Sequence, residues 1–159
     1  MPPRYSRFMN LSDLLSEEVV LTQLAPAARD EVIERLVDAV VESGALRPEH
    51  REAASGAVHR REASQTTGLG GGVAIPHGVC EHVDEVVAAL GIVPGGVDFA
   101  ALDGAPVQIV VLLLVPPNRF QAHIRTLAGI ARLLNDSRFR RRLVEADSPA
   151  AIMELIDER

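Results

Sequence analysis

A single histidine, His77, follows a glycine-rich segment whose residue types suit the binding of an anion. The segment from Thr66 to Gly78 contains five glycines, and Pro76 directly precedes the histidine. Pro76 favours an extended residue before it, and Gly78 permits a turn that a side chain would block. Backbone amides of such a segment can converge on an anion, because few Cβ atoms lie in the way. The amides expected to do so belong to Thr67, Gly68, Gly70, Gly72 and Gly78.

The chemistry that fits this pattern is the transfer of a phosphoryl group through His77. A neutral imidazole nitrogen is a nucleophile that can accept a phosphoryl group and pass it on. Positive charge and hydrogen-bond donors must then surround the phosphoryl oxygens. Arg61 lies just upstream and carries a guanidinium that can bond two of these oxygens, and His123 is the candidate second imidazole of the site. The reacting nitrogen depends on what the other nitrogen bonds to, which the sequence leaves open.

Plainer interpretations exist for each of these residues. A histidine after a proline is more often a capping or surface residue, and a histidine at the edge of a helix face is usually a boundary residue. Arg61 beside Arg60 is typical of a solvated helix end. The spacing of His77, Cys80 and His82 matches no established metal site, so we expect neither a metal nor another cofactor. Pro76 also forbids the helix that must follow a dinucleotide-binding loop.

The elements around this segment predict an α/β domain with helices before and after a small apolar sheet. The apolar runs 86–93 and 107–115 are typical of strands buried on both faces, and 19–24 is a shorter candidate strand. Helices are expected over 10–15, from Pro26 to Gly44, from Pro48 to about Arg61, from Asn118 as cap to about Leu134, around Phe139 to Val144, and from Ser148-Pro149 to the end.

Composition limits the function classes. The chain has 159 residues, which suits one domain, and 22 acidic against 16 basic residues give a net charge of −6. All basic residues are arginines, and this acidic surface disfavours nucleic acid as a partner. The arginine cluster at 138–142 is typical of a solvated helix face or of a contact with an acidic partner. One cysteine excludes an internal disulfide and favours a cytoplasmic location, and no apolar run is long enough for membrane insertion. We expect a tail over 1–8 and one domain over 9–159.

The residues from Thr67 to Gly78, with Arg61-Glu62 before them, resemble a known phosphorylation motif. They are similar to the enzyme IIA domains of the phosphoenolpyruvate-dependent phosphotransferase system, in the fructose/mannitol class (type 2) that includes the nitrogen-regulatory IIA proteins. Further landmarks that match are Asp98-Phe99, Leu102-Asp103-Gly104, Pro106-Val107, Leu113-Leu114-Val115-Pro116 and the helix with His123. Val79 and Gln108 depart from the residues common in this family, which bears on partner recognition.

The resemblance implies a phosphocarrier with a mixed sheet sandwiched by helices on both faces. The histidine that matches His77 accepts the phosphoryl group from a histidine phosphocarrier protein, and Arg61 and His123 support it. The next partner is either a IIB domain in fructose- or mannitol-type sugar uptake or a regulatory target protein. The length and short helical start favour the nitrogen-regulatory type. A module that keeps the fold and binds partners without carrying phosphate is a further alternative, which the intact His77, Arg61 and His123 disfavour.

Overall fold

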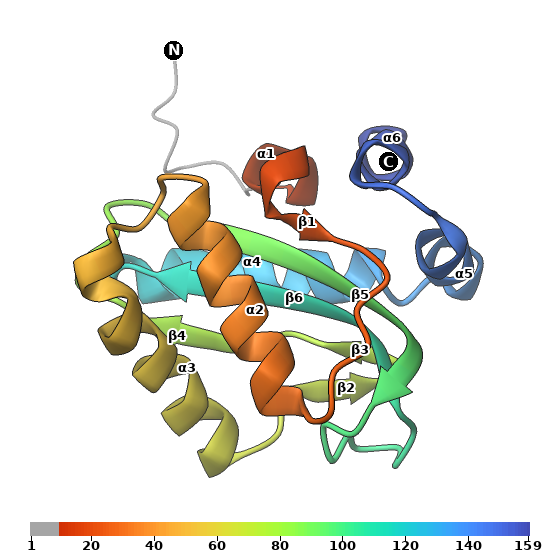
Figure 1. The fold of residues 1–159 in the computed structure, drawn as a ribbon, viewed down its shortest axis with the longest axis horizontal. Coiled ribbons are helices and arrows are strands. Elements are labelled where there is room, and N and C mark those ends of the chain that lie inside the picture. The colour runs from red at the N-terminus through yellow and green to blue at the C-terminus, as the bar shows by residue number, and fades with distance from the viewer. Residues whose placement is uncertain (1–9) are drawn as a thin grey trace.

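Residues 10–159, the part of the chain that the computed structural model describes, fold into a mixed sheet with helices on both faces (Figure 1). The expected tail over 1–8 lies outside the described residues. The helices are α1 (Leu11–Leu14), α2 (Arg29–Glu42), α3 (Arg51–Ser64), α4 (Phe120–Leu133), α5 (Ser137–Glu145) and α6 (Pro149–Asp157). The strands are β1 (Val20–Leu21), β2 (Gly68–Gly70), β3 (Val73–Ala74), β4 (His77–Val79), β5 (Val87–Val97) and β6 (Val107–Val115).

The two long strands β5 and β6 form the antiparallel centre of the sheet. The path across the sheet is β1-β5-β6-β3-β2, and β4 pairs with β6 beyond β3. Strands β3 and β4 both run parallel to β6, so the chain from residue 73 to residue 79 follows one edge of that strand. In this register His77 lies opposite Leu113. The edge of β6 therefore fixes where His77 stands.

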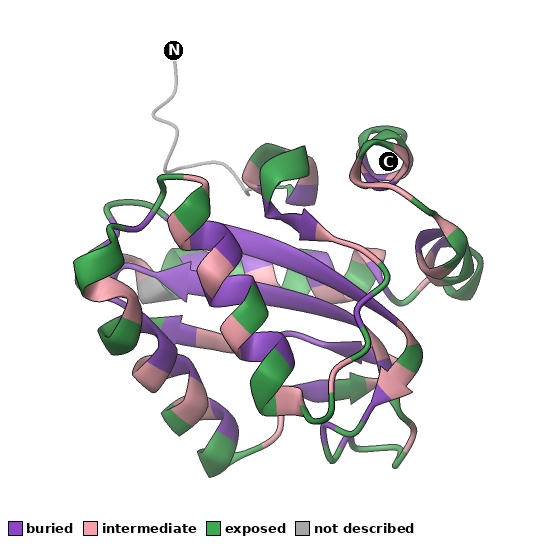
Figure 2. Ribbon diagram, in the orientation of Figure 1, coloured by how far each residue is buried: buried purple, intermediate pink, exposed green. Residues whose placement is uncertain are grey.

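Helices α2 and α3 cross one face of the sheet, and α4 lies behind the other face (Figure 1). Strands β5 and β6 are buried along most of their length between these layers (Figure 2). Leu112, Leu113 and Leu114 are fully inaccessible, as expected for consecutive residues of a strand covered on both faces. The predicted mixed sheet between two helical layers is thus confirmed.

Two expected helix starts are wrong. The helix expected from Pro26 begins at Arg29, because the Leu24 N–H bonds the Ile92 carbonyl at 3.0 Å and keeps the preceding chain along β5. The predicted strand over 19–24 shrinks to β1, because Val19 ends a 3-10 turn and only Val20 and Leu21 pair with β5. Asn118 does not cap α4, because it lies inside a 3-10 turn that precedes the helix.

Other helix ends follow their sequence signals. The Ser148 hydroxyl accepts the Ala151 N–H at 3.1 Å, so the predicted Ser-Pro start of α6 is confirmed. Asp136, which was not predicted as a cap, accepts the N–H groups of Arg138 and Phe139 at the start of α5.

None of the helices between residues 10 and 159 combines the length and apolar character that a membrane-spanning helix needs.

Candidate functional site

Helix α3 and strand β6 hold the segment that carries His77. The Leu113 N–H donates to the Pro76 carbonyl at 3.0 Å. Pro76 has no N–H of its own, so it pairs with the edge of the sheet through its carbonyl alone. On the other side, Gly78 faces the backbone of α3 so closely that an added Cβ would lie 2.9 Å from the Val58 nitrogen. Glycine is therefore needed here for the helix to approach, rather than for a turn. The approach places His77 beside the last turns of α3.

The imidazole of His77 is half-buried and anchored by one of its nitrogens. Nδ1 lies 3.0 Å from the Ile75 carbonyl oxygen, which can only accept a hydrogen bond. The proton of the neutral ring is therefore assigned to Nδ1, which leaves the lone pair on Nε2. Nε2 is therefore the ring nitrogen that this hydrogen bond leaves available.

A cavity of about 380 Å³ opens in front of this ring. Arg61 lines it together with His77, so the structure brings these two expected site residues together. Arg61 is oriented by a bond of 2.6 Å from Nη1 to the Gln65 carbonyl. The opposite wall comes from one face of α4, at Leu127, Ala128 and Ala131. A cation and an imidazole in one small cavity can receive a phosphoryl group.

Burial lowers the pKa of His77 below its usual range. The hydrogen bond to the Ile75 carbonyl acts in the opposite direction, the positive charge of Arg61 lowers the pKa further, and the carboxylate of Glu62 raises it. The net effect keeps the imidazole neutral at physiological pH. A neutral ring is the form that can act as a nucleophile.

His123 lies on α4, one helical turn before Leu127, and only 7% of it is exposed. Residues four apart share a helix face, so His123 lies on the face that forms the cavity wall, although it is not among the residues lining the cavity. Both of its ring nitrogens are buried without a hydrogen-bond partner among residues 10–159. Burial lowers the pKa of His123, and the charge of Arg119 adds to this effect. A buried imidazole without a partner is costly, which is typical of a group kept for function.

The glycine-rich segment forms a β-hairpin instead of a ring of free amides. Of the five expected donors, Thr67 and Gly68 line the cavity of His77. Their N–H groups donate to Glu62 and to the Thr66 hydroxyl respectively. Gly70 and Gly72 have positive φ angles in the tight turn between β2 and β3, and they line two other cavities. The structure therefore does not gather the five amides around His77.

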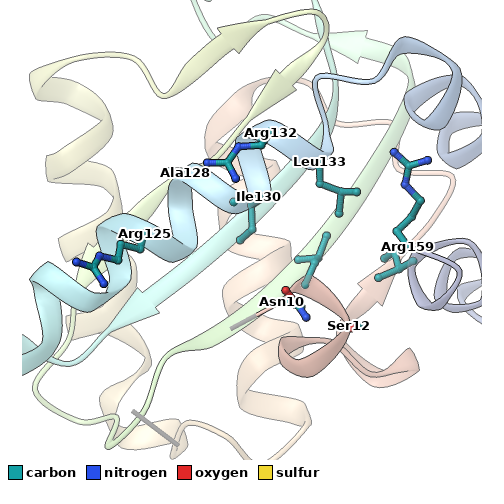
Figure 3. A pocket seen from close by; sticks show the side chains of 11 residues that line it. Asn10, Ser12, Arg125, Ala128, Ile130, Arg132, Leu133 and Arg159 are labelled. Atoms are coloured by element: carbon teal, nitrogen blue, oxygen red, sulfur yellow. The ribbon is translucent and has the colours of Figure 1, made fainter. Parts of the chain in front are cut away.

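A larger cavity of about 430 Å³ lies between α1, α4 and α6 (Figure 3). Arg125, Arg132 and Arg159 line it, but no histidine, cysteine or carboxylate does. Ser12 is there without a histidine that could serve as its base, so the cavity of His77 is the candidate site despite its smaller volume. Among residues 10–159, no three histidine, cysteine or acidic side chains form a group that could hold a metal ion.

Two residues at the site received no role from the sequence. Glu62 is 3% exposed and bonds Thr67 with both carboxylate oxygens. Leu102 is 76% exposed at the cavity rim, beside the half-exposed Leu69. The contact between Glu62 and Thr67 could not be predicted, because an acidic residue five positions before a threonine is a common pattern. An exposed leucine in a loop leaves no periodic signal at all.

The fold and site define an α/β domain with a half-buried histidine and an arginine in one cavity at the sheet edge. Residues 13–159 match the family described as phosphoenolpyruvate-dependent sugar phosphotransferase system, EIIA 2, and the chain belongs to this family. The resemblance stated from the sequence is thereby confirmed.

Relatives of two kinds are similar to this chain. A fructose-specific EIIA component of Haloferax volcanii is 31% identical over 149 residues, which cover 94% of this chain and 96% of the relative. A nitrogen regulatory protein of Bradyrhizobium diazoefficiens is 30% identical over 148 residues, 93% of this chain and 95% of that protein. The crystal structure of nitrogen regulatory protein IIA-Ntr from Neisseria meningitidis has a TM-score of 0.81 and 25% identity, covering 92% of this chain and 98% of its own.

Proposed function

We propose that this chain is a phosphoryl carrier in which Nε2 of His77 accepts a phosphoryl group and passes it on. The observation that carries the proposal is the bond from Nδ1 to the Ile75 carbonyl, which leaves Nε2 as the nucleophile of a ring that shares a cavity with Arg61. Membership of the EIIA family supports the same role. The donor is a phosphorylated histidine phosphocarrier protein.

The transfer needs no proton to move on the acceptor ring. The Nε2 lone pair forms a bond to phosphorus, while the bond from phosphorus to the donor's histidine nitrogen breaks and its electron pair stays on the donor. The proton of His77 remains on Nδ1, where the Ile75 carbonyl stabilises the positive charge that develops on the ring. The hydrogen bond therefore strengthens as the transfer proceeds.

Arg61 and His123 are the supporting residues of this proposal. Arg61 offers the phosphoryl oxygens a permanent positive charge in the same cavity as His77. His123 has two buried nitrogens without partners, and a donor N–H from this ring would gain its hydrogen bond when the phosphoryl group arrives. In the unphosphorylated protein the missing hydrogen bonds of His123 lower the stability, and phosphorylation restores one of them.

The next partner separates two candidate roles. We favour the nitrogen-regulatory type, in which phosphorylation adds about −1.5 to −2 charges at the site and changes which protein binds there. The structural similarity to IIA-Ntr from Neisseria meningitidis supports this role. The fructose-specific relative supports the second role, transfer to a IIB domain in sugar uptake. Mixing the phosphorylated protein with a fructose-type IIB domain separates them, since only the second role yields phosphorylated IIB.

The rate of phosphoryl acceptance is expected to fall at acidic pH. Protonation blocks Nε2, and the lowered pKa of His77 places this loss below about pH 6.5, the value of an unperturbed imidazole. In Arg61→Gln the depressing positive charge is gone, so the loss should begin at higher pH. Rates measured from about pH 5 to 8 with the same phosphorylated donor check this, because titration of the donor affects both proteins equally. An identical pH dependence would contradict the assignment.

The exposed apolar rim of the cavity is expected to receive the donor. Leu102 stands 76% exposed and Leu69 46% exposed, and both line the cavity of His77. We expect Leu102→Asp to weaken transfer from the carrier roughly tenfold, since a charge replaces an apolar contact in the interface. The effect should appear in the donor concentration needed for half-maximal rate. Ile124→Asp, on the outer face of α4, is the comparison, and a larger effect there would place docking elsewhere.

The proposed function is tested by incubating the protein with phosphoenolpyruvate, enzyme I and a histidine phosphocarrier protein. We expect a gain of one phosphoryl mass that is lost in acid and is stable in base, as a phosphoramidate is. No gain under conditions that phosphorylate a known EIIA protein would support the binding module that never carries phosphate.

A further inference from the structure

Glu62 is a buried carboxylate that the transfer step does not use. It lies in the last turn of α3 and is 3% exposed. Its two oxygens accept the Thr67 N–H at 2.8 Å and the Thr67 hydroxyl at 2.5 Å. Neither oxygen lies in an ion pair with an arginine or histidine of residues 10–159. Burying an unpaired carboxylate is costly, so its position requires an explanation.

A chain of hydrogen bonds connects this carboxylate to the imidazole. Glu62 holds Thr67 at its N–H and hydroxyl, and the Thr67 carbonyl accepts the Ile75 N–H at 3.2 Å. The Ile75 carbonyl in turn accepts the proton on Nδ1 of His77 at 3.0 Å. Thr67 and Ile75 are 6% and 4% exposed, so water does not compete along the chain. Glu62 is thus connected to the acceptor for Nδ1 through the hydrogen bonds of Thr67 and Ile75.

We infer that Glu62 is a positioning residue for the proposed phosphoryl transfer, holding the Ile75 carbonyl in place through Thr67 so that His77 presents Nε2. This inference rests on the proposed function of His77. The negative charge of Glu62 has a second effect, because it favours positive charge on a nearby ring. That charge develops when Nε2 bonds to phosphorus, so Glu62 stabilises the phosphorylated ring without touching it.

The electrostatics of His77 agree with this arrangement. The charge of Glu62 raises the pKa of His77, whereas the adjacent Arg61 lowers it. The two neighbours on α3 therefore act on the same ring in opposite directions. Arg61 favours the incoming anion and disfavours the cationic ring, and Glu62 compensates for the second effect.

The charge and the geometry can be tested with two variants. Glu62→Gln keeps an oxygen for the Thr67 N–H but removes the charge, so we expect a lower pKa of His77, an unchanged tautomer and roughly tenfold slower transfer. Glu62→Asp keeps the charge but is one methylene too short to bond both groups. There we expect a pKa near that of the native protein and a second tautomer. Long-range nitrogen–proton correlation spectra during a pH titration report both quantities for His77.

The control is Glu81→Gln, which removes the same charge from an exposed residue in the loop after β4. It should leave the tautomer, the pKa and the rate unchanged. If Glu62→Gln does not fold, as judged by circular dichroism, Thr67→Val removes only the hydroxyl and should weaken the tautomer preference. Folded Glu62 variants with the native tautomer, pKa and rate would overturn the inference.

The outcome for Glu62 can be distinguished from that for the proposed function. If the native protein accepts no phosphoryl group but the spectra of His77 respond to Glu62, the function is wrong and the structural coupling stands. If the native protein is phosphorylated and every Glu62 variant matches it, the inference alone fails.

Discussion

Replacing His77 by alanine is expected to reduce phosphoryl incorporation to background. The variant lacks the imidazole that lines the cavity with Arg61 and whose Nδ1 is bonded to the Ile75 carbonyl, which leaves Nε2 available. The hydroxyls of Thr66 and Thr67 also line that cavity, but they donate to the Phe99 carbonyl and to Glu62. Stability should fall only by about 1 kcal/mol, because one hydrogen bond is lost from a half-buried position. Intact-mass measurement after incubation with the phosphorylated carrier reads the first effect, and urea unfolding reads the second.

His82→Ala is the matched control for this result. His82 lies five residues further along the chain, is exposed, and stacks its ring on that of His50 at 3.7 Å. It should accept as much phosphoryl group as the native protein, because neither ring of this pair lines the cavity. Incorporation that persists in His77→Ala and is lost in His82→Ala would show that the acceptor is His82 and not His77.

The substitution His123→Leu is expected to slow transfer and stabilise the protein at the same time. Two buried nitrogens without partners disappear, so the free energy of unfolding should rise by about 1 kcal/mol or more. Transfer should fall roughly 100-fold, the usual loss when a hydrogen-bond donor to the reacting group is removed. Denaturant unfolding and single-turnover transfer measure the two effects on one preparation.

The stability of this variant should also respond less to acid. The lowered pKa of His123 means that the unfolded chain binds a proton more readily than the native protein. Native stability therefore falls as the pH decreases through about 6.5, and the leucine variant avoids its share of this loss. His59→Leu is the comparison, because its ring already lies 3.1 Å from the Glu34 carboxylate. His59→Leu should not gain stability. A gain equal to that of His123→Leu would show that the missing hydrogen-bond partners of His123 are not the cause of its effect.

The central strands and the His77 motif could be predicted because their signals are local. The run from Val107 to Val115 is apolar except for Gln108, and it forms β6 with the predicted bounds. The start of α2 could not be predicted in the same way, because it depends on the bond from Leu24 to Ile92, far along the chain. The strand expected to end at Val93 continues to Val97, since β6 offers it partners beyond an irregularity in the register.

The site was predictable in its residue types but not in its hydrogen bonds. Arg61 and His77 share a cavity as expected, because the end of α3 and the start of β4 meet beside β6. The roles of the glycines depend on packing, which the motif does not reveal. Gly78 is required by the approach of α3, and the N–H of Thr67 is used by Glu62. Only the folded arrangement distinguishes an amide that is free for an anion from one that is already bonded.

The most direct measurement is the identification of the nitrogen that carries the phosphoryl group. Nitrogen-labelled protein, phosphorylated through the carrier, is observed by long-range nitrogen–proton correlation of its histidine rings. We predict one modified ring, that of His77, with phosphorus on Nε2 and the proton retained on Nδ1. Phosphorus on Nδ1 of His77, or on any other residue, would contradict the role assigned to the Ile75 carbonyl and to the cavity in front of it.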